Sequence, residues 1–130
     1  MTGARVLVVE DESLLAETLC DLLQDAGCEP VGPAATVAAA LRLIELGGID
    51  VALLDIRLRQ ETSFPIAHVL RQRGIPWLFL TSYAQHQLPD DLSDALVIEK
   101  PFSPSALVET VLRLAALGQQ PRRSSVASRT

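Results

Sequence analysis

The chain has 130 residues, 48% of them hydrophobic, and a formal net charge of −5, which suits one compact domain with a substantial core. The negative charge argues against a general nucleic-acid surface, because phosphate binding needs clustered Lys and Arg. No apolar run approaches the roughly 18 residues of a membrane span, and the N-terminus lacks the cleavage site of a secretory signal. We therefore expect a cytoplasmic protein with no nucleic-acid or membrane partner.

The first half of the chain alternates short apolar runs with segments of helical period. A strand is predicted over residues 5–9, and a helix follows over 13–27. A weaker strand over 29–31 precedes a helix over 36–48, for which Thr36 is the predicted N-cap. This alternation is typical of βα units that build a parallel sheet.

The middle of the chain contains two further strands. The run "DVALLD" (50–55) is apolar on both faces, as a central parallel strand should be, and a helix is predicted near 63–73. The fourth strand is "PWLFLTS" (76–82). Only a short segment near 85–91, interrupted by proline, is a candidate for the helix after it. We therefore expect a shortened or irregular fourth helix.

The last unit begins with the strand "ALVIEK" (95–100) and continues with a helix that starts at the cap Ser103 and its following proline and ends near Leu117. The expected fold is α/β, a flavodoxin-like, doubly wound (βα)5 parallel sheet with the strand order 2-1-3-4-5. One domain should cover residues 1–118, and residues 119–130 should form a disordered tail.

Unusual polar residues follow four of the predicted strands at their carboxyl ends. These residues are Glu10 and Asp11 after the first strand, Asp55 at the end of the third, Thr81 and Ser82 after the fourth, and Lys100 after the fifth. Open α/β sheets bind ligands at this edge, where the strand order reverses. Carboxylates about 4 Å apart repel by on the order of 4 kcal/mol per pair, so a divalent cation is the simplest remedy. Because all the convergent ligands are oxygens, the sequence predicts Mg²⁺.

Asp55 is positioned to act as a nucleophile in this arrangement. A carboxylate can attack a phosphoryl group directly and form an acyl phosphate. Lys100 and the Thr81 hydroxyl would then hold two phosphoryl oxygens, which is the positioning that phosphoryl transfer requires. The sequence contains no nucleotide-binding glycine motif, so the phosphoryl donor must be another molecule.

Each of these features has a plainer interpretation when it is taken alone. The acids at 10–12 could form a solvated helix start, where negative charge complements the helix dipole. Asp55 could end its strand in a turn, and Lys100 could lie in a surface loop. Their joint occurrence at one edge of one sheet favours the metal and phosphate site.

Four motifs together resemble the response-regulator receiver domain of two-component signalling: "VLVVEDE", "VALLDI", "FLTSY" and "EKPF", within about residues 5–117. The resemblance implies a phosphoacceptor, Asp55, and an acidic pair for Mg²⁺, Glu10 and Asp11, of which Asp11 would be the direct ligand. It also implies further site residues: the backbone carbonyl of Arg57 as a metal ligand, Thr81 as the switch hydroxyl, Ser82 as its small neighbour, Lys100 as the phosphate-binding cation, and Pro101 after a cis peptide bond.

The chain also departs from the usual receiver pattern. Val97 stands where receivers usually have Tyr or Phe, so the familiar aromatic switch is absent, and Tyr83 is the candidate substitute. The run "PWLFLTSY" resembles the PFxFATGY-type motif of an atypical group of single-domain receivers. The usual proline and glycine after the phosphoacceptor are replaced by residues 59–61, whose conformation the sequence does not predict.

The resemblance implies a signalling phosphoacceptor that is not an enzyme in its own right, although it can catalyse its own phosphorylation and dephosphorylation. A histidine kinase or histidine phosphotransferase would be the donor, and the face between Thr81 and Pro101 would switch to bind a downstream protein. Homodimerisation is left open.

Two alternatives remain: a pseudo-receiver that binds partners without phosphorylation, and a Mg²⁺-dependent aspartyl-phosphate phosphatase or phosphotransferase. Arg57 disfavours the last, since such enzymes commonly have a second acid at that position.

Overall fold

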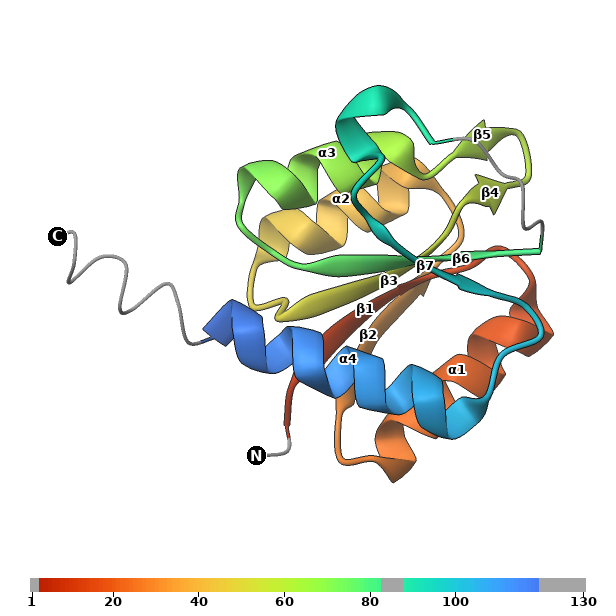
Figure 1. The fold of residues 1–130 in the computed structure, drawn as a ribbon, viewed down its shortest axis with the longest axis vertical. Coiled ribbons are helices and arrows are strands. Elements are labelled where there is room, and N and C mark those ends of the chain that lie inside the picture. Colours follow the sequence, from red (N-terminus) through yellow and green to blue (C-terminus); the bar gives the residue numbers. More distant parts are fainter. Residues whose placement is uncertain (1–2, 83–87, 120–130) are drawn as a thin grey trace, which may run out of the picture.

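The structure, a computed structural model, describes residues 3–82 and 88–119, with the side chains of the last two residues left out. Helices and strands alternate along the chain (Figure 1). In chain order they are β1 (Arg5–Val9), α1 (Ser13–Asp25), β2 (Glu29–Ala34), α2 (Val37–Leu46), β3 (Val51–Asp55), β4 (Arg57–Leu58), β5 (Glu61–Thr62), α3 (Phe64–Gln72), β6 (Trp77–Thr81), the 3₁₀ turn η1 (Asp90–Leu92), β7 (Leu96–Glu99) and α4 (Pro104–Gln119).

The main sheet has five parallel strands in the order β2-β1-β3-β6-β7. Counted along the chain as the five principal strands, this is the predicted order 2-1-3-4-5, which is confirmed. Helices α1 and α4 cover one face of the sheet, and α2 and α3 cover the other (Figure 1). The strand order reverses between β1 and β3, so the ends of these two strands form the edge at which open α/β sheets bind ligands.

The core consists of two hydrophobic clusters, one on each face of the sheet. Every residue of β3 and of β6 is buried, because both strands lie in the middle of the sheet and are covered on both sides. Neighbouring residues of β3 therefore belong to different clusters: Leu53 packs on the side of α1 and α4, and Leu54 packs on the side of α2 and α3.

Helix starts follow the signals in the sequence. The Thr36 hydroxyl accepts a hydrogen bond of 3.1 Å from the backbone N–H of Ala39, which caps α2 as predicted. At the start of α4, the Ser103 hydroxyl accepts a bond of 3.3 Å from the N–H of Ala106. Both caps lie on the carboxyl side of the sheet, so they place the loops that surround the candidate site.

A small antiparallel hairpin follows β3, where the sequence did not predict a conformation. β4 pairs with β5 through Arg57 opposite Thr62 and Leu58 opposite Glu61. The Glu61 carboxylate accepts a hydrogen bond of 3.0 Å from the backbone N–H of Val37, the first residue of α2. The hairpin is thereby attached to the helix N-terminus beside it.

The connection between β6 and β7 contains no α-helix within the described residues. Its described part, from Leu88 onward, forms the turn η1 at Asp90–Leu92, with the Leu92 side chain fully buried. The shortened fourth helix predicted for 85–91 is consistent with this turn, although residues 83–87 lie outside the described part of the chain. The predicted tail 119–130 lies almost entirely outside it as well, and its disorder stays a prediction.

Candidate functional site

Three carboxylates meet where β1 and β3 end. Asp55 is the last residue of β3, and Glu10 and Asp11 directly follow β1, which runs beside β3 in parallel. One carboxylate oxygen from each lies within 4.8 Å of the others. Glu10 and Asp55 are only 3% and 7% exposed, so two of these charges are nearly out of contact with water. The parallel register of the two strands thus assembles the acidic cluster that the sequence predicts.

Lys100 supplies the positive charge of this cluster. It follows β7 directly, and its ammonium nitrogen Nζ lies 3.2 Å from Asp55 Oδ2 and 3.5 Å from Glu10 Oε1. Its backbone N–H donates a bond of 2.7 Å to the carbonyl of Thr81, which ties the end of β7 to the end of β6. The peptide bond between Lys100 and Pro101 is cis. One cation therefore stands between two buried carboxylates.

Glu10 is an acid of the site with a shifted pKa. Burial raises its pKa to about 7, and the neighbouring charge of Asp55 acts in the same direction, whereas a bond from the Glu12 backbone N–H and the charge of Lys100 oppose the rise. The Glu12 N–H donates to Glu10 Oε2 at 3.1 Å. Glu10 Oε1 is buried and accepts no hydrogen bond from a described residue. A buried oxygen with unused lone pairs, beside two other carboxylates, fits a hard divalent cation such as Mg²⁺.

A cavity of about 200 Å³ opens over the cluster. Its walls come from the ends of four strands, and they contain the described residues that the sequence predicted to hold the metal ion and the phosphoryl group. The lining residues are Glu10, Asp11, Glu12, Asp55, Arg57, Thr81, Ser82 and Lys100. Thr81 is 2% exposed whereas Ser82 is exposed, so the threonine forms the inner wall and the serine the rim. Tyr83, the candidate aromatic switch, lies outside the described residues.

Sequence reasoning assigned no role to two residues that the structure brings to this site. Glu12 contributes its backbone N–H to Glu10, and Arg59, at the tip of the β4–β5 hairpin, places its Nε 3.9 Å from Asp11 Oδ2. The Arg59 side chain is 83% exposed, so this contact is loose. The turn of the hairpin brings Arg59 back toward Asp11. Because the sequence contains no recognisable turn motif here, this contact could not be predicted from it.

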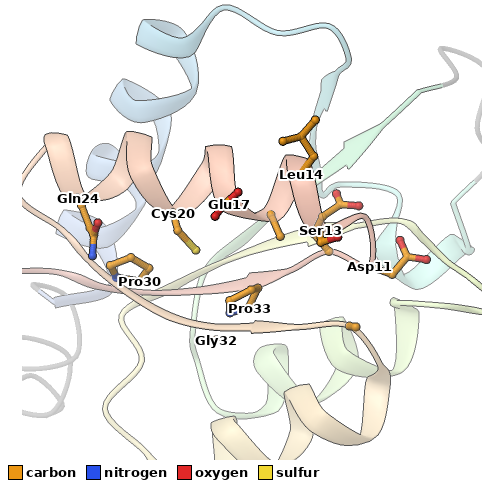
Figure 2. A pocket seen from close by; sticks show the side chains of 12 residues that line it. Asp11, Ser13, Leu14, Glu17, Cys20, Gln24, Pro30, Gly32 and Pro33 are labelled. Atoms are coloured by element: carbon orange, nitrogen blue, oxygen red, sulfur yellow. The ribbon is translucent and has the colours of Figure 1, made fainter.

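A larger groove of about 720 Å³ begins at the acidic cluster and follows α1. Figure 2 shows Ser13, Glu17, Cys20 and Gln24 along the helix opposite Pro30, Gly32 and Pro33 of β2, whereas the Leu14 side chain points away from that strand. Glu10 and Asp11 line this groove as well as the cavity, so the two spaces share a wall. Leu14, at the end near the acids, is 72% exposed. The groove thus offers apolar contacts beside the site.

The described residues contain no helix that is both long enough and apolar enough to cross a membrane.

Comparisons with known proteins give one consistent result. The family model described as the response regulator receiver domain matches residues 6–112. The solution structure of SdrG from Sphingomonas melonis Fr1 is 38% identical, with a TM-score of 0.75 over 88% of this chain and 97% of that one. TrrA from Thermotoga maritima, in complex with Mg(2+)-BeF, is 28% identical, with a TM-score of 0.76 over 85% and 98%.

A curated relative is longer than this chain. The transcriptional regulatory protein PdtaR from Mycobacterium tuberculosis is 32% identical over 111 residues, which are 82% of this chain and 54% of that protein. The chain spans about half the length of this and other curated relatives that it matches.

Proposed function

The chain belongs to the response regulator receiver domain family of two-component signalling, and from that premise we propose that it is a phosphoacceptor that is modified on Asp55 with the help of Mg²⁺. One observation carries the proposal: Lys100 Nζ lies 3.2 Å from Asp55 Oδ2, inside a cavity where three carboxylates have oxygens within 4.8 Å of one another. A nucleophile, a cation for the phosphoryl oxygens and a set of metal ligands are thus close together.

In the proposed reaction, an Asp55 oxygen attacks the phosphorus of a phosphohistidine on the donor protein. The new O–P bond forms as the N–P bond of the histidine breaks, and the leaving imidazole takes a proton. Lys100 pairs with one oxygen of the attached phosphoryl group, and the Thr81 hydroxyl donates to another. No nucleotide and no separate general base are required at this step.

Glu10, Asp11, Asp55 and the backbone carbonyl of Arg57 would hold the metal ion. Bound Mg²⁺ supplies charge neutralisation, so that an anionic phosphoryl group can approach three carboxylates. Because the pKa of Glu10 is near 7, binding of such an ion would displace any remaining proton from this carboxyl group to solvent. The donor set contains only oxygen, as Mg²⁺ prefers.

The groove along α1 and the β7 edge of the sheet supply two surfaces for protein partners. The groove adjoins Asp11, so a histidine kinase or histidine phosphotransferase that docks there would bring its histidine to the cavity. At the other surface, Leu96 and Val97 of β7 are 49% and 42% exposed, which is unusual for apolar strand residues. We assign this second surface to the downstream partner, and phosphorylation would change it through Thr81.

The test is to follow Trp77 fluorescence on adding Mg²⁺ and then beryllofluoride or acetyl phosphate, with mass spectrometry of the products. Wild type should respond and gain one phosphoryl group, and Asp55→Ala should do neither. Asp25→Ala is the matched control, since it removes an exposed carboxylate of α1 away from the site, and it should behave as wild type.

Two results would overturn this proposal. A wild-type chain that neither responds nor gains a phosphate would instead be a phosphorylation-independent pseudo-receiver. Sustained Asp55-dependent hydrolysis of a phosphate monoester, as distinct from turnover of acetyl phosphate through self-phosphorylation, would identify a phosphatase, which the position of Arg57 on the cavity wall disfavours.

A further inference from the structure

A single arginine joins α3 to the turn that precedes β7. One guanidinium nitrogen of Arg71, Nη2, lies 3.0 Å from Asp94 Oδ1, and the other, Nη1, donates to the backbone carbonyl of Asp91. The guanidinium carbon lies 5.1 Å from the centre of the Trp77 ring, which is a cation–π contact. We call these three contacts the Arg71 clamp. Arg71 is also the main cause of the lowered pKa of Asp94.

Two further contacts hold the same turn against the body of the protein. His68, one helical turn before Arg71, places Nε2 2.8 Å from Asp91 Oδ2. Leu92 lies between Asp91 and Asp94 in the sequence, and its side chain is fully buried in the hydrophobic cluster on the α2 and α3 face of the sheet. Figure 1 shows η1 lying over α3. Residues 91–94 are therefore fixed to α3 by polar contacts on the outside and by an apolar side chain on the inside.

The clamp lies on the path of chain that links the switch residue to the exposed edge strand. Thr81 ends β6, the clamped turn follows, and Leu96 and Val97 of β7 come directly after it. The clamp also touches β6 itself, because Trp77 is the first residue of that strand. The rings of Trp77 and Phe79 pack edge to face with their centres 6.2 Å apart, and Phe79 lies two residues before Thr81.

We propose that the Arg71 clamp holds the face between Thr81 and Pro101 in its resting arrangement and so sets the threshold for its phosphorylation-dependent change. This inference rests on the function proposed above. When Thr81 turns toward a phosphoryl group on Asp55, β6 has to adjust at its end, and the clamp opposes that adjustment through its contact with Trp77 of the same strand. A ligand shifts such an equilibrium only by its difference in affinity for the two states, so every contact confined to the resting state weakens apparent binding.

The Arg71 clamp is partly exposed, which suits contacts that a conformational switch has to break. Arg71 is 44% exposed and Asp94 76%, so solvent weakens the ion pair, whereas the stacking on Trp77 and the carbonyl bond order the guanidinium. Lysine can keep the charge, but it cannot keep the planar, forked geometry. The clamp therefore depends on an arginine at this position.

The experiment measures beryllofluoride affinity by calorimetry at saturating Mg²⁺. Arg71→Gln should bind about three- to tenfold more tightly than wild type, because the resting arrangement loses its clamp. Arg73→Gln is the matched control: Arg73 follows α3 directly, is 45% exposed and contacts Glu45 at 3.9 Å, not the turn. It should stay within about twofold of wild type. Equal affinities for the two variants, or weaker binding by Arg71→Gln, would overturn the clamp.

A second readout needs no phosphoryl analogue. In the resting protein, amide hydrogen exchange of the peptide that covers residues 90–96 should be faster in Arg71→Gln and in Asp94→Asn than in Arg73→Gln. Asp94 is exposed, so its substitution tests the clamp without disturbing Trp77. Unchanged exchange in both clamp variants also refutes the inference. If wild type fails to bind beryllofluoride at all, the proposed function fails, and the exchange data show separately whether the clamp orders the turn.

Discussion

At the scale of single residues, Glu10 combines burial with an elevated pKa of about 7, compared with an ordinary value of 4.5. Between these two pH values the folded state holds a proton that the unfolded state has lost. The contribution of Glu10 to the free energy of unfolding is therefore fully present below about pH 4.5, and it is lost as pH rises through about 7. The cause is the cost of an ionised carboxylate that is buried beside Asp55.

We predict that Glu10→Gln removes this decrease in the free energy of unfolding with rising pH. The decrease should amount to about 1–3 kcal/mol in the metal-free wild-type protein. Urea unfolding in EDTA at pH 5 and pH 8 measures it as the difference between wild type and variant. Glu17→Gln, an exposed acid of α1, should retain the wild-type pH dependence. Parallel curves for wild type and Glu10→Gln would show that Glu10 ionises normally. Saturating Mg²⁺ should reduce the wild-type loss, because the ion stabilises the ionised carboxylate.

The residues of the acidic cluster could be predicted from sequence because each directly ends or follows an apolar run that is recognisable as a strand. Parallel strands bring such positions to one edge, whatever their separation along the chain. Arg59 and Glu12 could not be assigned in this way. The first depends on how the hairpin turns back toward Asp11, and the second acts through its backbone N–H, which no residue type reveals.

At the scale of elements, a hydrogen bond from α2 joins the β4–β5 hairpin to the start of that helix. Glu61→Ala removes the carboxylate that accepts from the N–H of Val37 and should cost about 1 kcal/mol. Gln60→Ala, at the tip of the same hairpin, is the control and should change stability by less than about 0.5 kcal/mol. Thermal unfolding of both variants measures the difference. Equal melting temperatures would mean that the Thr36 cap alone is sufficient for α2.

The elements that were predicted well have strong periodicity, and those that were not are short. The helices over 13–27 and 36–48 were predicted from their apolar spacing, caps and glycines, and they occur as α1 and α2. The hairpin strands have two residues each, which is too few for any alternation to be visible. The turn η1 owes its position to Arg71, His68 and buried Leu92, and such contacts cannot be read from local sequence.

At the scale of the whole molecule, the two hydrophobic clusters share the same sheet, and β3 contributes to both. We predict that Leu53→Ala and Leu54→Ala, on opposite faces of β3, each lower stability by about 2–5 kcal/mol and leave a single unfolding transition. Far-UV circular dichroism and Trp77 fluorescence should coincide during urea unfolding of both variants. Separate transitions would show that the faces unfold independently, against the prediction of one domain over 1–118.

The overall topology was predictable because alternation of strands and helices leaves few arrangements of a parallel sheet. What the alternation cannot provide is the detailed surface, such as the exposure of Leu96 and Val97.

The placement of Lys100 after the final strand has a consequence for biosynthesis. The two acids that it contacts are made much earlier, since Glu10 and Asp55 precede it by 90 and 45 positions. A nascent polypeptide made only as far as β6 would lack the Lys100 ammonium, so the buried carboxylates of Glu10 and Asp55 would face each other without that cation. We therefore expect the charge balance at this edge to be complete only after Lys100 has left the ribosome.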